Sequence, residues 1–481
     1  MGVGSLAVPA MAQNMEDAAR HEQAGDYAAA ARLLEAVVVA EPGDPAAWEA
    51  LARNRYWAGD PHAARHTYED GLALHPTYLP LQLGYARLLV DLQDGPAARR
   101  ALFPLRDHPE AGAEAERLLG TLAYWRGDLS TADRHFRRAL ARDPGDEAAR
   151  RQRGEIRAHS RPWLRLAGGG LTDSQPVRSA DAEAEVGAFL TPLHAVSVAA
   201  SGRRFAAADS TRDVQALRLA YRGHWPTLRL DTELAAGPLW RQGEDTDWTG
   251  RVALGVRLPE AVTATLAAER AAYLYTEASL FEPVITTTAS GKLAWAPTNG
   301  WLAEAGLARI GFPDTNSQTN AYAWALAPLA AGLWGAVQAG YAFSYQHADS
   351  SRFTVVLAAA PRPGQPAHFE GRYVPYYTPD RLSAHSLTWA ARAVPHRYVT
   401  LRAGGSYGVF AREEAPFATT VGPGGPPLVG TYDNRFNPWE ARASVEARGL
   451  GPVTASAEIR HARTAFYDVT TAVVTLLYRP R

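Results

Sequence analysis

The sequence predicts an α + β multidomain protein, in which an N-terminal α-solenoid of four helical repeats precedes a transmembrane antiparallel β-barrel of about 16 strands. Two observations support this prediction. Small and apolar residues recur at helical spacing before residue 160, whereas short alternating segments, broken by Gly, Pro and Asp, follow it. Ten of the 13 tryptophans lie after residue 160, so the two parts also differ in composition.

The composition excludes several classes of protein. With 481 residues, 47% of them hydrophobic and 21% charged, and a formal charge of −1, the chain is neither a disordered acidic segment nor a globally basic nucleic-acid binder. It has no cysteine, which excludes disulfide scaffolds, zinc ribbons, iron–sulfur clusters and thiol nucleophiles. The sequence contains no apolar run long enough for a conventional transmembrane helix.

The first residues resemble the end of a secretory signal peptide. Small residues over 9–12 (PAMA) precede Gln13, as at a cleavage site, although the basic start is missing and the apolar stretch is short. We expect residues 1–12 to be a residual signal peptide. The alternative is a chance match in an alanine-rich chain.

A repeat of 34 residues organises the first part. Turn pairs begin at Gly25, Gly59, Gln93 and Gly127, and each is followed by Asp. In the same register lie the small residues Ala30, Ala64, Ala98 and Ala132 and the larger residues Leu34, Tyr68, Leu102 and Phe136. Prolines end the units at 42, 76 and 144, and one residue early at 109. This pattern matches the tetratricopeptide repeat, which we place at residues 13–158; the alternative is a generic helical bundle.

Aromatic side chains of the first helix in a unit are the candidates for partner binding, because that helix usually lines the concave face of such repeats. These candidates are Tyr56, Trp57, Tyr85, Tyr124 and Trp125. Some of them must also belong to the core.

The second part, residues 162–481, has the alternation of barrel strands. In residues 251–258 (RVALGVRL), Val252, Leu254 and Val256 share one face, and Arg251 and Arg257 share the other. Strands are expected to start near residues 163, 183, 194, 213, 226, 248, 261, 286, 299, 319, 331, 380, 396, 436, 450 and 467.

The links between these segments indicate a bacterial outer-membrane barrel. Short links, such as 258–260 and 296–300, alternate with long ones at 205–212, 311–318, 346–379 and 411–435. Tryptophans near segment ends would form the interfacial girdles: Trp225, Trp240, Trp248, Trp295, Trp301 and Trp334. The alternative is a soluble all-β domain, but its core would need bulkier residues than the Ala, Val and Leu found here.

Charged residues on the polar faces are the candidates for lining a wet lumen, since about sixteen strands leave an aqueous channel. They are Arg218, Arg222, Arg229, Asp231, Glu233, Arg251, Arg257, Glu304, Arg402, Glu458 and Arg460. Mixed charge suits transient hydrogen bonds to a hydrated polymer. Ion pairs that only hold the wall together are an equally good explanation for any single residue.

The sequence contains no motif of a known catalytic site. It has no nucleophile elbow, phosphate-binding loop or His-Glu-x-x-His motif. His62 and His66 have helical spacing and could hold a metal ion, but a solvated helix face is the favoured interpretation. We therefore expect no enzyme activity, no cofactor and no metal site.

The layout of helical repeats followed by a barrel resembles bacterial exopolysaccharide-secretion porins of the cellulose-synthase C subunit and poly-N-acetylglucosamine porin type. Residues 371–382 (GRYVPYYTPDRL) look like the tyrosine-x-proline stretch before a late strand in the cellulose-type barrels, and residues 403–408 (AGGSYG) are similar in texture. These porins usually carry many more than four repeats, and YaiO-type outer-membrane barrels, which also occur with repeats, are an equally close match.

The resemblance implies an outer-membrane channel for a polysaccharide, with periplasmic repeats that dock partner proteins or peptidoglycan. Its partners would be outer-membrane lipid, periplasmic proteins or peptidoglycan, and the polysaccharide, but no nucleic acid. The glycan-contact candidates are Tyr373, Tyr376, Tyr377 and Arg381; these tyrosines could instead belong to the interfacial girdle.

Two other functions remain open. The chain could be an outer-membrane-anchored adaptor or assembly protein whose repeats bind partners and whose barrel is plugged. It could also be a passive diffusion porin with an appended scaffold. A lumen filled by the 346–379 loop would favour the adaptor, and an open lumen with aromatic residues along it would favour export.

Overall fold

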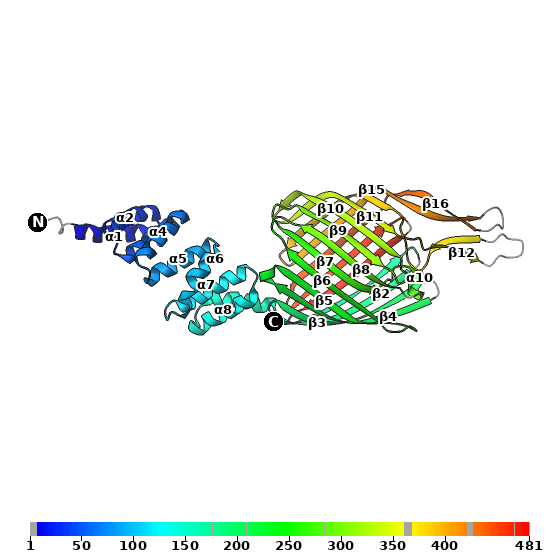
Figure 1. The fold of residues 1–481 in the computed structure, drawn as a ribbon, viewed down its shortest axis with the longest axis horizontal. Helices are drawn as coiled ribbons and strands as arrows, with labels where there is room; N and C mark the ends of the chain where they lie inside the picture. The colour runs from blue at the N-terminus through cyan, green and yellow to red at the C-terminus, as the bar shows by residue number, and fades with distance from the viewer. Residues whose placement is uncertain are drawn as a thin grey trace. The chain divides into compact units, whose positions relative to one another are not determined.

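The computed structural model divides the chain into two units, Met1–His159 and Ser160–Arg481. It describes residues 7–175, 177–207, 210–282, 284–359, 368–420, 427–465 and 467–480. Figure 1 shows helices in the first unit and a sheet closed into a barrel in the second. Of the proposed signal peptide, residues 1–6 lie outside the described residues, and residues 7–12 begin the first helix.

The N-terminal unit is a series of antiparallel helix pairs. Its α-helices are α1 (Ala7–Gln23), α2 (Tyr27–Ala40), α3 (Pro45–Trp57), α4 (Pro61–Leu74), α5 (Leu79–Asp91), α6 (Gly95–Leu102), α7 (Gly112–Trp125), α8 (Leu129–Arg142) and α9 (Glu147–His159). The 3-10 helix η1 (Pro104–Asp107) lies between α6 and α7. None of the helices that the structure describes is both long and apolar enough to cross a membrane.

In the repeated turn pair, the first residue ends one helix and the second caps the start of the next. Gly25, Gly59 and Gly127 have φ between 76° and 88°, a left-handed conformation that favours glycine and ends the preceding helix. The aspartate that follows each of them accepts a hydrogen bond from a backbone N–H of the next helix. Gln93 takes the same left-handed position with φ 57°. The pair therefore sets each helix–helix turn.

The small residues of the repeat allow paired helices to approach closely. Ala30, Ala64, Ala98 and Ala132 are fully buried. The larger residue four positions later on the same helix is buried as well, from Leu34 in α2 to Phe136 in α8. The repeat therefore supplies the core of this unit, as its periodicity predicts.

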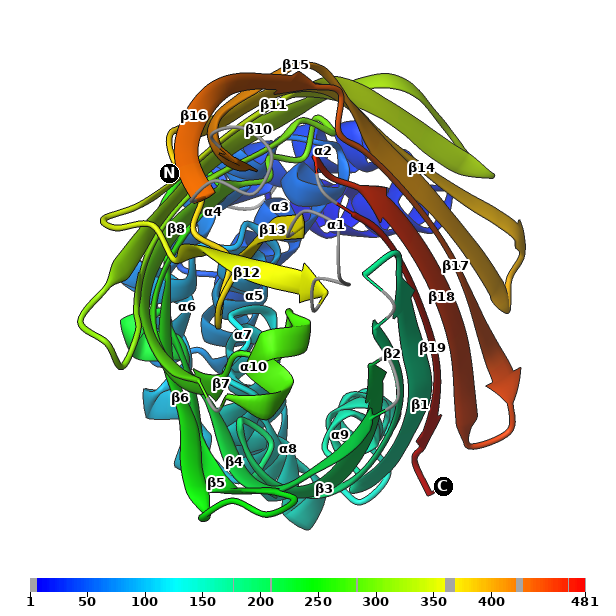
Figure 2. The same ribbon diagram turned by 90° about the vertical axis from the view of Figure 1, so that its right-hand side faces the viewer.

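The C-terminal unit is a closed meander of antiparallel strands. They are β1 (Trp163–Asp173), β2 (Val177–Thr191), β3 (His194–Ala207), β4 (Ser210–Trp225), β5 (Leu230–Arg241), β6 (Asp247–Arg257), β7 (Val262–Ala272), β8 (Ile285–Trp295), β9 (Leu302–Gly311), β10 (Ser317–Gly332), β11 (Gly335–Ala348), β14 (Leu382–His396), β15 (Val399–Thr420), β17 (Trp439–Leu450), β18 (Val453–Arg463) and β19 (Asp468–Tyr478). Each pairs with its neighbours, and β1 pairs with β19, from Leu164–Tyr478 to Asp173–Val469, which closes the ring (Figure 2).

Among the described strands, 16 close the barrel, which confirms the predicted fold class. The expected starts agree with the observed ones within a few residues; the largest difference is at β2, which begins at Val177 instead of near 183. Three further strands were not predicted: β12 (Phe353–Ala359) and β13 (His368–Tyr373) lie within the long link predicted at 346–379, and β16 (Pro427–Phe436) covers the end of the one predicted at 411–435. They form hairpins outside the barrel wall, which alternation alone does not distinguish from wall strands.

The two rims of the barrel differ. On one rim, which we call the short-turn rim, strands are joined by tight turns such as 192–193, 333–334 and 397–398, and both ends of the barrel sequence lie there. The opposite rim, the long-loop rim, carries the helix α10 (Glu277–Phe281), the β12–β13 hairpin, and a second hairpin made by β16 and the end of β15. Because β1 starts on the short-turn rim, the chain enters the barrel there.

Candidate functional site

The inner face of the barrel wall is identified by what packs on it. Leu280 of α10 belongs to one apolar cluster with Val177, Phe205, Val214 and Leu239 from the strands. Figure 2 places α10 inside the ring of strands. The strand residues of this cluster therefore face the lumen, and since side chains alternate along a strand, the face of every other barrel residue follows from the pairing registers.

Ten of the eleven predicted lumen residues lie on this inner face. The exception is Arg229, which occupies the β4–β5 turn in a left-handed conformation with φ 51°. Alternation assigns a face only within a strand, and Arg229 lies one residue before β5. Within this set, the structure brings Arg257 to Asp231 at 3.2 Å and Arg251 to Glu233 at 3.8 Å.

Most of the other pairs join a predicted residue to one that sequence reasoning missed. Arg218 lies 3.5 Å from Glu183, Arg402 lies 3.1 Å from Glu446, and Arg460 lies 2.6 Å from Glu440. The missed acids occupy alternate positions of their strands, so the same alternation could have identified them. The inner wall therefore carries neighbouring cations and anions that form ion pairs with one another.

On the same inner wall, the carboxylate of Glu304 has a neutral partner, Tyr322, as well as a charged one, Lys292. The hydroxyl of Tyr322 on β10 donates to Glu304 Oε1 at 2.7 Å, while Lys292 Nζ donates to Glu304 Oε2 at 3.2 Å. One carboxylate thus binds an ammonium group and a phenol at once.

Two loops of the long-loop rim meet at the mouth of the barrel. Thr276, which caps α10, donates a hydrogen bond of 2.6 Å to the carbonyl oxygen of Pro375. The ring of Tyr376 stacks on Phe312 at 3.6 Å between centroids, and its side chain is only 1% exposed. We call residues 373–380 the mouth segment.

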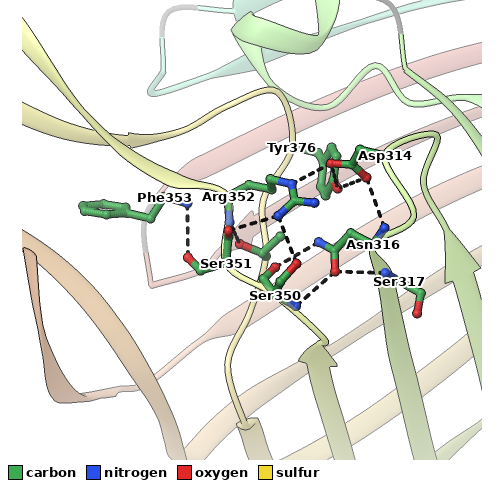
Figure 3. A network of polar contacts seen from close by, with 9 residues as sticks. Asp314, Asn316, Ser317, Ser350, Ser351, Arg352, Phe353 and Tyr376 are labelled. Carbon is green, nitrogen blue, oxygen red and sulfur yellow. Dashed lines mark hydrogen bonds and ion pairs between the residues drawn. The ribbon is translucent and has the colours of Figure 1, made fainter.

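Asp314 anchors the mouth segment, as Figure 3 shows. Its carboxylate accepts hydrogen bonds from the Tyr376 hydroxyl at 2.7 Å and from Arg352 Nε at 2.6 Å. Arg352 also donates its backbone N–H to Thr378 Oγ1 at 2.9 Å. Burial alone would raise the pKa of Asp314, but the bonds from Arg352 and Tyr376 hold this pKa below its ordinary value. Burial and the bond to Asp314 raise the pKa of Tyr376 to about 12.

A second anchor joins the mouth segment to the projecting hairpin. The hydroxyl of Tyr377 donates to Glu413, which is fully buried one residue beyond the last β14–β15 pair. Burial raises the pKa of Glu413 to about 7, the charge of Asp380 adds to this rise, and the bond from Tyr377 offsets part of it. No described residue bonds the second carboxylate oxygen of Glu413, which can therefore carry the proton.

The glycan-contact candidates are therefore packed to different degrees. Tyr376 is enclosed by protein, and the ring of Tyr373 lies edge-on to Tyr377 at 4.9 Å between centroids. Arg381 is exposed, 3.7 Å from both Asp380 and Glu414. The sequence analysis singled out this segment but not its anchors, because they are distant in sequence: Phe312 and Asp314 lie in the β9–β10 loop and Glu413 lies on β15.

The partner-binding candidates of the repeats fall into two groups. Trp57 and Trp125 are 47% and 53% exposed. The tyrosines instead bond acidic side chains: Tyr56 to Asp91 at 3.2 Å, Tyr85 to Glu69 at 2.8 Å, and Tyr124 to Glu155 at 2.8 Å.

Family models match only the N-terminal unit. A model described as tetratricopeptide repeat matches residues 56–122, and a second with the same description matches residues 18–54. This unit therefore contains tetratricopeptide repeats, as its sequence predicts. No curated protein matches the chain.

Among solved structures, the chain is similar to a protein described as a bacterial polysaccharide outer membrane secretin. The TM-score is 0.51 at 11% identity, over 67% of this chain and 99% of that one, which supports a shared barrel fold. Weaker similarities are to CdiB from Acinetobacter baumannii (TM-score 0.38, 9% identity, 66% of this chain and 60% of that one) and to MamA from Desulfovibrio magneticus RS-1 (TM-score 0.28, 19% identity, 30% and 82%).

Proposed function

We propose that this protein is a non-catalytic outer-membrane channel that exports a polysaccharide, and that its repeats dock periplasmic proteins or peptidoglycan. The observation that carries the proposal is the closed 16-strand barrel with charge pairs along its inner wall. A polysaccharide outer membrane secretin has the same barrel fold. Barrels of about this size enclose water, unlike those of eight strands.

The charged wall suits a hydrated polymer. Ion pairs such as Arg402–Glu446 and Arg251–Glu269 keep donors and acceptors at the inner surface, where sugar hydroxyls can exchange hydrogen bonds with them. Where a cation and an anion are paired in this way, their fields largely cancel, so the paired part of the wall would not hold the polymer in place.

The orientation follows from the two rims. In outer-membrane barrels the short turns face the periplasm and the long loops face outward. The chain enters this barrel on the short-turn rim, at β1, so the repeats would lie in the periplasm. There the exposed Trp57 and Trp125 would take part in docking, because aromatic side chains are frequent at the centre of protein interfaces.

The mouth segment would then lie at the outer exit. Tyr373, Tyr377 and Arg381 would meet the glycan there, and Tyr376 would do so only when its bond to Asp314 is released. Aromatic rings offer flat faces on which sugar rings stack.

A second function is favoured by the same segment. An adaptor or assembly protein would have a plugged barrel. At the mouth of this barrel, α10 and the mouth segment pack on the inner wall and contact each other. In that case the barrel is an anchor and the repeats perform the function.

The deciding experiment compares extracellular and periplasmic polysaccharide in a strain lacking the gene, its parent and a complemented strain. Export predicts less secreted glycan and more periplasmic glycan in the deletion strain. Unchanged secretion contradicts export. Complementation with the Tyr373→Ala variant, which leaves the bonds of Tyr376 and Tyr377 to their acidic partners in place, tests the tyrosine role: a loss of secretion with normal barrel assembly supports glycan contact, whereas a loss of assembly supports a girdle role.

A further inference from the structure

The outer wall of the barrel contains an apolar groove over β11, β14, β15, β17, β18 and β19. It is a shallow, open hollow with a volume of about 710 Å³. Two rows of directly paired residues line it: Ala391, Ala403, Ala443, Ile459 and Ala472 in one, and Ala393, Leu401, Val445, Ala457 and Val474 in the other. The alanines leave a hollow between the larger side chains.

This groove lies on the face opposite the lumen. Leu401, Val445 and Ile459 are exposed there and alternate along their strands with inner-face residues such as Arg402 and Glu458. Every residue of the two rows is apolar; the lining also includes Arg392, Arg402, Ser444 and Glu458, which alternate with the rows on the inner face. In a membrane-spanning barrel this face is in contact with acyl chains, so an apolar chain is the occupant that the groove fits.

Basic residues lie at the short-turn rim of the same strands, a few residues beyond the rows that line the groove. Arg397 lies in the β14–β15 turn, Arg448 lies just before the β17–β18 turn, and Arg479 follows β19. These segments lie side by side, because Arg448 N donates to Tyr398 O at 2.7 Å and Arg479 N donates to Pro452 O at 2.9 Å. Arg397 and Arg479 are therefore brought to one part of the rim, whereas the guanidinium of Arg448 pairs with the inner-face residue Glu446.

Two of these arginines are available to a ligand. Arg448 pairs with Glu446, whereas Arg397 and Arg479 are exposed and form no ion pair within the described part of the chain. Arg397 stacks over the ring of Tyr398 at 4.6 Å from the centroid. Of the other short turns, those at 191–194, 258–261, 296–301 and 332–335 contain neither arginine nor lysine, and the one at 226–229 contains a single arginine, Arg229.

We propose that the groove binds an anionic glycerophospholipid, with an acyl chain along the two apolar rows and the phosphate at Arg397 and Arg479. Arginine donors match phosphate oxygens in geometry and charge. Tyr398 and Tyr478, both exposed at this rim, lie where interfacial aromatic residues meet headgroups. The assignment rests on the barrel spanning a membrane, as the proposed function requires, but not on what crosses the lumen.

The test is native mass spectrometry of the full chain, extracted in detergent from vesicles of equimolar phosphatidylglycerol and phosphatidylethanolamine. The wild-type protein is expected to retain phosphatidylglycerol over phosphatidylethanolamine by roughly tenfold or more, since each arginine near an anionic headgroup favours binding several-fold. The Arg397→Gln/Arg479→Gln variant is expected to lose this preference. Arg229→Gln, which changes an exposed arginine of the β4–β5 turn, is the matched control and should keep it.

A second variant tests the groove separately from the rim. Ala403→Leu/Ala443→Leu fills the hollow at two directly paired positions, and is expected to reduce retention of both lipids. Each variant is scored only after its folded barrel has been verified by heat-modifiable electrophoretic migration. The proposal is overturned if the wild type retains neither lipid or both equally, or if the arginine variant keeps the preference. Polysaccharide secretion is measured in parallel, so a failure of export is seen independently of lipid binding.

Discussion

At the scale of single residues, Asp314 is the group on which the mouth of the barrel depends. Its carboxylate holds Tyr376 and Arg352, both from the β11–β14 connection, although it lies in the β9–β10 loop itself. Loss of one partner of a charged hydrogen bond leaves the other group unsatisfied and costs more than an average bond.

Replacing this carboxylate should loosen the mouth segment. In Asp314→Ala, single-channel recordings in planar bilayers are expected to show larger or more frequent openings than the wild type, because Tyr376 and Arg352 lose their common acceptor. Asp245→Ala, an exposed acid of the β5–β6 loop, is the control and should leave the recordings unchanged. Identical recordings for the wild type and Asp314→Ala would contradict this anchoring role.

Glu413 should make the same region sensitive to pH. Its pKa is raised from 4.5 to about 7 by burial, so the protonated form favours the packed state. That contribution is complete below pH 4.5 and is lost as pH rises through about 7. Protection of the mouth segment against proteolysis is therefore expected to fall from pH 5 to 8. Glu413→Gln should remove this dependence, and an unchanged pH profile in that variant would refute the assignment.

Side-chain orientation at this scale could be predicted from the sequence, but side-chain partners could not. Alternation assigned Arg402 and Glu458 to the polar face of their strands. The partner of Arg402 is Glu446, two strands ahead in the sequence but adjacent in the sheet. Such a pair depends on the register between β15 and β17. The long connection between these two strands does not fix that register in a way that can be read from its length.

At the scale of elements, caps explain why the helical unit follows its sequence so closely. Each repeat carries its own stop and start signals, the left-handed glycine and the aspartate after it, so the helix limits depend on local residues. Strand limits also follow local turns. The hairpin of β16 and the end of β15 was not predicted, because alternation is the same inside and outside a barrel wall.

Removal of one cap should destabilise the repeats measurably. Asp128 accepts the N–H of Thr131 at 3.1 Å, so Asp128→Ala is expected to lower the free energy of unfolding of the helical unit by about 1 kcal/mol. Urea denaturation followed by circular dichroism at the helical minimum measures this change. Asp70→Ala, at an exposed site within α4, is the control; equal midpoints for both variants would argue against the cap.

At the scale of the whole molecule, the inner wall should give a channel of weak ion selectivity. Many of its cations lie beside anions, as in Arg251–Glu269, Lys292–Glu304 and Arg460–Glu440. The reversal potential in a KCl gradient is therefore expected to stay near zero. Arg402→Glu should shift it toward cation selectivity, and Arg204→Glu, on the outer face, should not. A strongly selective wild type would contradict this balance.

Closure of the barrel also makes its assembly dependent on a complete chain. Because β1 pairs with β19, the first strand of the sheet has no second neighbour until the last eleven described strand residues, Asp468–Tyr478, are present. A truncated chain would remain an open ribbon with two unpaired edges, which are prone to aggregation. Only a chain that includes β19 can form the hydrogen bonds along the free edge of β1, so closure of the ring has to wait until the last strand has been synthesised.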